Sequence, residues 1–314
     1  MKQIDKLKFL PITIDDKEIF DEFFINNDSI SCANDFSTIF CWNVEGNVRY
    51  TIVDDDVLIV YNIYEGKKAY YFPISKSKQN IRPYVEMILD CENYNCHFIA
   101  QLEQNALNQI SDIEGYELID DRDFSDYIYL SKDLQDLKGK KYHSKRNHLN
   151  KFRKSYSYTF REYEKSDYQK CMDLYDLWLE RSGSSPTSEK TAIELALKNY
   201  QALKLKCGVI EIDGEIKAFS INSLLPNKRA GNVLFEKADV NYDGIFAAIN
   251  NFSVKMFFKD IEYINRQEDM GIPGLRKAKL SYHPAFILNK YRLVCQNNKN
   301  INKKSISDSL TITR

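Results

Sequence analysis

The sequence lacks the features that most often mark a metal site or a secreted protein. Its seven cysteines are scattered and form no CxxC pair, and its four histidines include no HExxH motif, so we expect no metal site. The odd number of cysteines favours reduced thiols that are buried as small apolar side chains. These absences predict a cytoplasmic protein without a disulfide framework.

Long apolar runs are also absent. The densest apolar stretches, residues 57–61 and 252–258, fall short of the roughly 18 residues that a membrane-spanning helix needs. Residues 1–10 include four charged side chains, which leaves no apolar core for a secretory signal. We therefore expect a soluble chain with no integral membrane segment.

The net charge is close to zero, because 44 Lys and Arg stand against 45 Asp and Glu. Attraction of the whole protein to nucleic acid or anionic lipid is thus excluded, and any polyanion site has to be a local patch. With 43% apolar residues and only 11 Gly and 7 Pro among 314 residues, the composition is globular. The length allows one large domain or two ordinary ones.

Apolar patterns predict mainly strands in the first half. Residues 37–73 are expected to form a strand meander, in which three aspartates at 54–56 turn the chain and residues 57–61 return as a buried strand. A helix is expected at about 81–91, and a further strand at 126–130.

The second half predicts a regular order of elements. Residues 166–169 match a capping box that opens a helix ending at Gly183, and a second helix is expected from about residue 187. Asp213-Gly214 predicts the turn of a β-hairpin. The later elements are a strand at 231–239, a helix at 245–258, a strand at 261–265, a helix near Leu275 and a final strand at 286–294.

Residues 138–154 form the one block of like charge, with eight Lys or Arg, two His and no acid. Apolar residues recur in it at partly helical spacing, which predicts a helix with one packed and one basic face. Two interpretations are open: a solvated linker helix, or a surface where Lys145, Arg146 and Asn147 bind the phosphates of RNA, a nucleotide or a lipid head group.

Four segments together resemble a known family. They are Asp35-Phe36, KYHSKRNHLNKF at 141–152, FEKAD at 235–239 with Gly244 behind it, and INRQEDMGIPGLRKAKLSYHP at 264–284. They are similar to the soluble bacterial relatives of the C-terminal domain of phosphatidylglycerol lysyltransferase, over nearly the whole chain to about Val294. The resemblance implies an α/β (α+β) fold of tandem GNAT-like acyltransferase domains, with mixed, mainly antiparallel sheets flanked by helices.

The resemblance also implies a function. The best-known members of that family move an aminoacyl group from aminoacyl-tRNA to the head group of phosphatidylglycerol, and they carry a membrane portion that this sequence lacks. An acyl or aminoacyl transferase is therefore expected. The alternatives are a coenzyme A-dependent N-acetyltransferase, and a catalytically inactive GNAT-like protein that binds RNA or a nucleotide through Lys140, Lys141, Lys145 and Arg146.

From the element order and this likeness, we predict a GNAT-like domain at 1–135 and a second at 136–296, with the basic helix near their junction. Residues 297–314, rich in Asn, Lys and Ser, are expected to be a disordered tail.

Acyl transfer needs a group that frees the nucleophile, donors for the developing oxyanion and a proton source for the leaving group. Glu236, near the end of the strand at 231–239, is the first candidate for the base. The alternative is that Glu236 and Lys237 only alternate between the faces of a half-exposed strand. Tyr282 is a candidate acid or hydrogen-bond donor.

Polar residues follow the predicted strand at 261–265. Arg266 is expected to bind a phosphate or carboxylate, and Glu268 or Asp269 to receive an ammonium group, unless this segment is only a surface loop. In the fold that the resemblance implies, the strands that carry Glu236 and Ile264 are neighbours that part at their ends, so we expect Glu236, Arg266, Glu268 and Asp269 to line one cleft. The predicted ligand-binding residues of this segment are Asn265, Arg266, Gly271, Gly274, Arg276 and Lys279.

No cofactor is required, and two acyl donors are compatible with the sequence, aminoacyl-tRNA and a coenzyme A thioester. A glycine-rich loop before the helix at 245–258 would hold the pyrophosphate of coenzyme A, and only Gly244 matches that pattern. The sequence therefore leaves room for aminoacyl-tRNA, whose phosphates the basic helix would hold.

Overall fold

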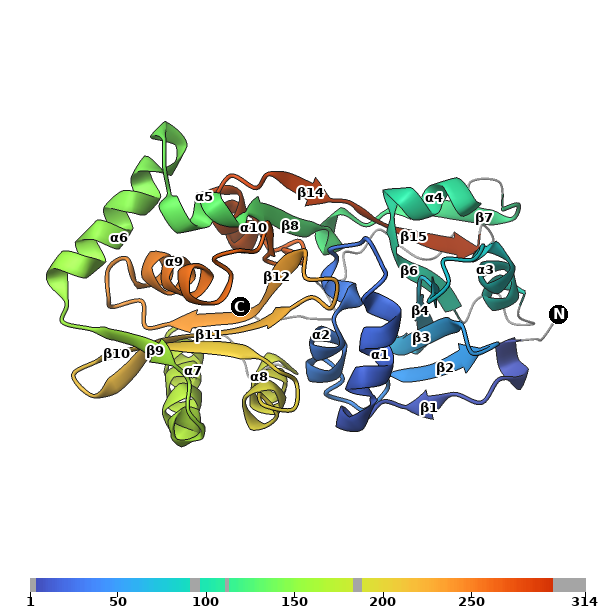
Figure 1. The fold of residues 1–314 in the computed structure, drawn as a ribbon, viewed down its shortest axis with the longest axis horizontal. Coiled ribbons are helices and arrows are strands. Elements are labelled where there is room, and N and C mark those ends of the chain that lie inside the picture. The colour runs from blue at the N-terminus through green and yellow to red at the C-terminus, as the bar shows by residue number, and fades with distance from the viewer. Residues whose placement is uncertain (1–3, 91–96, 111–112, 183–187, 296–314) are drawn as a thin grey trace. The chain divides into compact units, whose positions relative to one another are not determined.

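The computed structural model describes residues 4–90, 97–110, 113–182 and 188–295. The predicted tail at 297–314, Cys91 and Cys96 lie outside these ranges. The chain is a mixed α/β protein with two mainly antiparallel sheets flanked by helices, which confirms the predicted fold class (Figure 1). Within the described residues, one unit contains residues up to 126, 268–273 and from 287, and the other contains 127–267 and 274–286.

The sheet of the first unit has the strand order β1-β2-β3-β4-β6-β15-β7, with β5 paired to β3. Its strands are β1 (Leu10–Pro11), β2 (Arg49–Val53), β3 (Val57–Tyr64), β4 (Lys67–Tyr71), β5 (Ile74–Ser75), β6 (His97–Glu103), β7 (Tyr116–Asp120) and β15 (Lys290–Cys295). The helices are α1 (Lys17–Phe24), α2 (Phe36–Cys41), α3 (Arg82–Leu89) and α4 (Gln104–Ile110), with 3-10 turns at η1 (Ile4–Lys6), η2 (Ile14–Asp16), η3 (Cys32–Asn34) and η4 (Arg122–Phe124).

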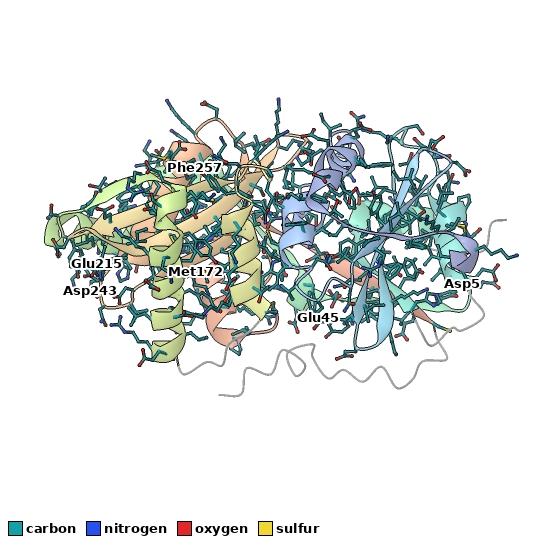
Figure 2. The ribbon with its side chains drawn as sticks, turned by 90° about the horizontal axis from the view of Figure 1, so that it is seen from below. Asp5, Glu45, Met172, Glu215, Asp243 and Phe257 are labelled. Atoms are coloured by element: carbon teal, nitrogen blue, oxygen red, sulfur yellow. The ribbon has the colours of Figure 1, made fainter. Side chains whose placement is uncertain are left out.

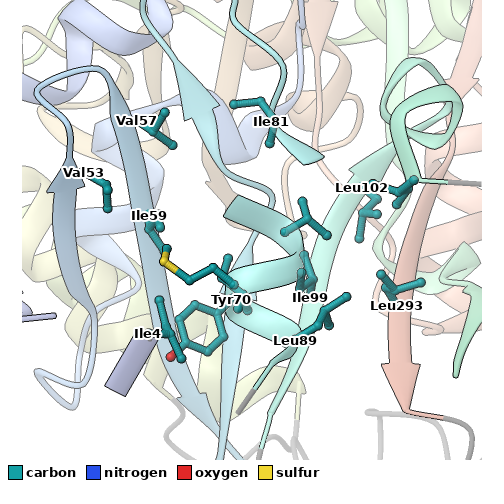
Figure 3. Packing of buried hydrophobic residues seen from close by; sticks show 14 residues of the cluster. Ile4, Val53, Val57, Ile59, Tyr70, Ile81, Leu89, Ile99, Leu102 and Leu293 are labelled. Carbon is teal, nitrogen blue, oxygen red and sulfur yellow. The ribbon is translucent and has the colours of Figure 1, made fainter. Parts of the chain in front are cut away.

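The first half of strand β3, residues 57–60, is continuously apolar because both of its faces are buried. Val57 and Ile59 belong to a core cluster that also includes Val85 of α3 (Figure 3). Val60 alternates to the opposite face, where its partner in the β2 register, Tyr50, packs edge-on against Phe20 of α1 with ring centroids 5.1 Å apart. The predicted meander is thus confirmed from Arg49 onward.

Residues 36–41 form helix α2, so the prediction of a strand there is wrong. Asp35 caps the helix, and its Oδ1 accepts a hydrogen bond of 2.9 Å from the backbone N–H of Ser37. Helix α2 has only six residues, and in so short a segment the spacing of apolar residues does not distinguish a helix from a strand.

The sheet of the second unit has the strand order β14-β8-β13-β12-β11-β10-β9. Its strands are β8 (Asp126–Leu130), β9 (Thr159–Glu162), β10 (Lys206–Ile212), β11 (Glu215–Leu224), β12 (Ala230–Ala238), β13 (Tyr263–Asn265) and β14 (Phe286–Leu288). The helices are α5 (Ser131–Asp136), α6 (His143–Ser155), α7 (Tyr168–Ser182), α8 (Ser188–Lys198), α9 (Ile245–Phe257) and α10 (Pro273–Leu280), with 3-10 turns at η5 (Lys140–Tyr142) and η6 (Lys165–Asp167). Helix α9 covers one face of this sheet, and α7 and α8 cover the other (Figure 1).

The local signals of the second half are mostly confirmed. Asp213 and Gly214 both have positive φ, 52° and 77°, as a two-residue hairpin turn between β10 and β11 requires. The capping box lies two residues earlier than predicted, because Glu164 and Asp167 form it at η6.

The last predicted strand is two strands in two different sheets. β14 pairs at the edge of the second sheet, whereas β15 lies between β6 and β7 of the first sheet. In addition, residues 127–135, which were predicted in the first domain, belong to the second unit. Residues 268–273, which were predicted in the second domain, belong to the first unit. Apolar periodicity identifies a strand but not its distant partner, so the sequence does not reveal such exchanges.

Helix α6 approaches the start of α9 at Gly244. Gly244 has φ +83°, and a Cβ atom there would lie 2.1 Å from the backbone oxygen of His148 in α6. The apolar residues Leu149 and Phe152 of α6 are buried in the same core cluster as Ile245. Gly244 is therefore explained by packing between two helices.

Gly244→Ala should destabilise the protein more than Gly214→Ala. Both glycines have a left-handed backbone, which costs alanine roughly 1 to 2 kcal/mol, but nothing lies within 4 Å of the Cβ position at Gly214. The clash with His148 adds roughly 1 to 3 kcal/mol at Gly244 alone. Urea unfolding of both variants measures the difference, and equal losses would show that α6 does not press on this glycine.

Candidate functional site

The second sheet opens where β12 and β13 part. Their parallel pairing covers three residue pairs, from Ala230 opposite Tyr263 to Asn232 opposite Asn265. β12 then continues to Ala238, and its remaining residues pair with β11. Side chains beyond the last pair can therefore face the opening from both strands.

Glu236 and Arg266 meet beyond this parting point. The Arg266 guanidinium forms an ion pair with Glu236 Oε2, and Glu236 Oε1 accepts a hydrogen bond of 3.1 Å from Asn250 Nδ2 of α9. The two charged side chains are only 15% and 10% exposed. The expectation that these two residues approach each other is met, although their roles in a reaction stay predictions.

Glu236 and its neighbour Lys237 lie on opposite faces of the sheet, as expected for consecutive residues of a strand. Lys237 Nζ lies 2.9 Å from Glu189 Oε2 of α8 and 3.6 Å from the ring centroid of Trp178 on α7. Lys237 is thus held on the far face by partners of its own, while Glu236 faces the opening.

The Arg266 guanidinium retains unused hydrogen-bonding capacity. It lies 4.8 Å from the ring centroid of Tyr282 and 5.9 Å from that of Tyr129. Burial raises the pKa of Tyr282, and the guanidinium is close enough to its hydroxyl to offset part of that rise. The buried Nη1 atom of Arg266 nevertheless has no acceptor at hydrogen-bond geometry within the described ranges of the chain. A buried donor without an acceptor is costly in free energy, so Nη1 marks a place for a ligand acceptor.

Lys145 of α6 adds a second cationic group. Its Nζ lies 4.0 Å from the Tyr282 ring centroid. Burial, followed by the nearby charge of Arg266, lowers the pKa of Lys145 from 10.5 to about 8. Burial raises the pKa of Tyr282 to about 12, so its hydroxyl is neutral at physiological pH.

This cluster carries more positive than negative charge at neutral pH. Two cations, Arg266 and Lys145, stand beside one carboxylate, Glu236, whose two oxygens already accept hydrogen bonds. Lys279 lies close by and donates to the backbone oxygen of Arg266 at 2.6 Å. Such an arrangement suits an anionic group or an oxygen that gains charge during a reaction.

Other predicted site residues have structural partners. Arg146 donates to the backbone oxygens of Leu137 and Gly139, and Asn147 bonds to His143 across 3.1 Å on the same helix. Asn265 Oδ1 accepts from the backbone N–H of Gln267 at 2.7 Å and shapes the turn after β13.

The predicted residues after β13 divide between the two units. Glu268 and Asp269 belong to the first unit and make their described contacts there: Glu268 with Cys32, and Asp269 with Arg122. Gly271 packs against Asp123 in the same unit, whereas Gly274 and Arg276 lie on α10 of the second unit. The described contacts of Glu268 and Asp269 thus lie in the first unit, and their role beside Glu236 and Arg266 stays a prediction.

The basic block forms helix α6 and the turn before it, as predicted, but many of its cations are already paired. Lys138 lies 3.0 Å from Asp136 and Lys141 lies 3.0 Å from Asp133. Lys151 pairs with Asp243, which is labelled in Figure 2. The block is therefore less strongly positive than its sequence indicates.

A second cluster of polar residues lies in the first unit. Cys32, Asp126 and Glu268 could together hold a metal ion, but Lys290 Nζ lies 2.7 Å from Asp126 Oδ1 and 3.5 Å from Cys32 Sγ. This ammonium supplies the positive charge that a cation would bring. Burial raises the pKa of the Cys32 thiol well above its usual value, so the cluster is a structural ion pair with a protonated thiol.

Sequence reasoning missed Tyr129 and Asn250. The signal for Asn250 is present, because Asn250-Asn251 interrupts the otherwise apolar helix at 245–258. Both asparagines are almost fully buried, and Asn251 caps backbone oxygens of α5 while Asn250 binds Glu236. Polar residues inside an apolar helix thus point to the site.

The family model described as "Phosphatidylglycerol lysyltransferase, C-terminal" matches residues 28–294. The chain belongs to this family. A conserved protein of unknown function from Bacteroides thetaiotaomicron is 32% identical, with a TM-score of 0.86 over 92% of this chain and 100% of that one. Among the described residues of this family member, no helix is both long and apolar enough to cross a membrane.

Two more distant structures share the fold. L-PGS from Bacillus licheniformis is 16% identical, with a TM-score of 0.68 over 95% of this chain and 97% of that one. The C-terminal domain of a putative lysylphosphatidylglycerol synthetase from Agrobacterium fabrum is also 16% identical, with a TM-score of 0.63 over 89% and 91%. The phosphatidylglycerol lysyltransferase C-terminal fold is thus common to all of these chains.

Arg266→Ala should destabilise this family member. The substitution leaves the Glu236 carboxylate buried and unpaired, which costs roughly 3 to 5 kcal/mol. Arg82→Ala breaks a more exposed pair with Glu86 and should cost less than about 1 kcal/mol. Guanidinium unfolding compares the two variants, and similar small losses would mean that the Glu236–Arg266 pair is not buried in solution.

Lys145 should titrate at about pH 8, well below the 10.5 of an ordinary lysine. Reductive ¹³C-methylation followed by NMR titration measures the pKa of each lysine, and Lys145→Arg identifies the resonance. Lys151, six residues later on the exposed face of α6, is the control. A Lys145 resonance that titrates together with the exposed lysines would show that its amine is in water.

Proposed function

We propose that the protein is an aminoacyltransferase, which takes an aminoacyl group from aminoacyl-tRNA and passes it to a hydroxyl or amine acceptor at the Glu236–Arg266 cluster. The single observation that carries this proposal is the buried Arg266 Nη1, a donor without an acceptor at the place where β12 and β13 part. Membership of the phosphatidylglycerol lysyltransferase C-terminal family supports transferase chemistry.

The reaction needs charge stabilisation at one oxygen. The acceptor oxygen or nitrogen attacks the carbonyl carbon of the aminoacyl ester, and the carbonyl oxygen becomes an oxyanion. Collapse of this intermediate breaks the bond to the ribose oxygen of tRNA. The proton lost by the acceptor ends on that ribose hydroxyl, so the transfer is balanced without any further reactant.

Arg266 and Lys145 are assigned to the oxyanion. Nη1 of Arg266 is buried, and Lys145 lies beside it over the Tyr282 ring, so both donors act where water is scarce. Glu236 holds the guanidinium in place, because both carboxylate oxygens accept hydrogen bonds from Asn250 and Arg266. Tyr282, neutral at physiological pH, is assigned to proton transfer.

The start of α9 favours tRNA over coenzyme A as the donor. A coenzyme A pyrophosphate would bind the backbone N–H groups at this helix start. Gly244, the N-cap, instead packs against the backbone of His148 in α6, at a distance that leaves no room for a methyl group. This packing competes with a phosphate at the same place.

Helix α6 is the part of the site that we assign to the tRNA backbone. Its exposed ion pairs, such as Lys151 with Asp243, are weak because water and salt screen them, so a phosphate can replace the aspartate at small cost. Binding of this kind weakens steeply as salt concentration rises.

The decisive assay follows label from aminoacyl-tRNA into a second product. Purified protein is incubated with tRNA charged with a radiolabelled amino acid, and with phosphatidylglycerol vesicles or a small-molecule amine as the acceptor. Lys145→Met should lower turnover by roughly 100-fold, by loss of one oxyanion donor. Lys198→Met, which removes an exposed cation of α8 whose ion pair is with Glu194 on the same helix, should change turnover less than threefold.

Three results would contradict this proposal. Transfer from acetyl coenzyme A but not from charged tRNA would assign the protein to the N-acetyltransferases. Salt-sensitive tRNA binding without product, from every charged species and acceptor tried, would indicate a binding protein. Equal losses in the Lys145 and Lys198 variants would place the reaction elsewhere.

A further inference from the structure

The first unit contains a cavity of about 290 Å³ that the transferase site does not use. It lies between α1, the loop at 26–29, the α2 region, β3, the segment 71–81, β6 and α4, all within residues 24–109. Taking about 30 Å³ for one water molecule, it has room for about ten non-hydrogen atoms. This is the size of a small organic molecule.

One wall of the cavity is built around Glu103 at the end of β6. Ser29 accepts a hydrogen bond of 3.0 Å from the backbone N–H of Ser31, which orients its own hydroxyl toward Glu103 Oε1. Among the described residues, Glu103 makes no ion pair. Lys290, its partner in the β6–β15 register, directs its ammonium to Asp126 Oδ1 at 2.7 Å.

Gln101 adds a second acceptor to the same wall. Its Oε1 atom is buried and has no hydrogen-bond partner within the described part of the chain. Its backbone has φ +60°, a left-handed conformation inside a strand, and β15 shifts its register against β6 at this place. Non-glycine residues held in this conformation are costly and cluster at ligand sites.

The lining also has an apolar part. Phe24 of α1, Ile39 of α2, Leu58 and Val60 of β3 and Ile81 belong to it. The one lysine of the lining, Lys78, lies 3.4 Å from Asp28, and both side chains are more than half exposed at the rim. Apart from Lys78, the residues that line the cavity include no lysine or arginine, and they provide the acceptors of Glu103 and Gln101 together with apolar side chains.

We propose that this cavity binds a small organic amine, whose ammonium group donates to Glu103 and to Gln101 Oε1 and whose carbon chain lies on the apolar part of the lining. Among the described residues, Glu103 makes no ion pair and Gln101 Oε1 accepts no hydrogen bond, so an ammonium matches both acceptors, whereas a carboxylate or phosphate would meet like charge at Glu103. The buried position strengthens the interaction, because few water molecules screen it.

This proposal does not depend on the transferase function, since the residues belong to a different unit and the test measures binding alone. Three probes of the same length are used with the full chain: pentylamine, pentanol and valerate. NMR chemical-shift titration or saturation-transfer difference measures each dissociation constant. Pentylamine should bind at least about tenfold more tightly than pentanol, and valerate should not bind.

Glu103→Gln is the matched variant. Glutamine keeps an acceptor for Ser29, and because burial already raises the pKa of Glu103, loss of the charge should leave the fold intact. The variant should lose at least about tenfold in affinity for pentylamine and little for pentanol. Asp28→Asn makes the same change at the exposed rim of the cavity and should alter either affinity less than twofold.

The proposal is overturned by any of three outcomes. These are equal affinity for pentylamine and pentanol, preference for valerate, or an amine affinity that Glu103→Gln leaves unchanged while circular dichroism shows a folded variant. Failure of all three probes to bind at 10 mM, roughly the weakest affinity such a titration measures, would likewise overturn it.

Discussion

The short parallel junction of β12 and β13 is the constraint on which the second unit's chemistry depends. Beyond the last residue pair, each strand must find other partners for its backbone groups. On the β13 side β8 provides them, since Arg266 N–H donates to Tyr127 O at 3.0 Å and Tyr127 N–H donates to Gln267 O at 3.1 Å. The backbone of Arg266 is therefore fixed on one side and faces the opening on the other.

The same constraint explains why the charged groups lie where water is limited. α9 closes one face of the sheet and brings the amide of Asn250 to Glu236, while α6 brings Lys145 over Tyr282. Both oxygens of Glu236 thus have partners that the fold supplies, whereas Arg266 Nη1 finds no acceptor within the described residues. In a protein interior of low dielectric constant, one unsatisfied donor has a large effect on what the site can bind.

Local patterns in the sequence were enough for most elements of the second unit, such as the Asp213-Gly214 hairpin and the apolar helix after Gly244. The meeting of Glu236 with Arg266 was expected from the fold that the family resemblance implies, because a local pattern does not show that β12 and β13 are neighbours. The surroundings of Glu268 were not predictable, because they depend on Cys32, more than 200 positions away. The pairing of Gln101's strand with β15 is equally distant, so the cavity beside it left no trace in the local pattern.

The place of β15 has a consequence for the order in which the protein can be assembled during synthesis. β15 fills the gap between β6 and β7, yet it begins about 190 residues after β6 ends. At roughly 5 to 20 residues per second, the ribosome needs about 10 to 40 seconds to cover that interval. During this time β15 has not yet been made, so the edges of β6 and β7 that it later covers have unpaired N–H and C=O groups, which can pair with strands of other chains. The first unit to be translated is therefore the last to be completed, and a chaperone that shields strand edges would act on it before the second unit needs help.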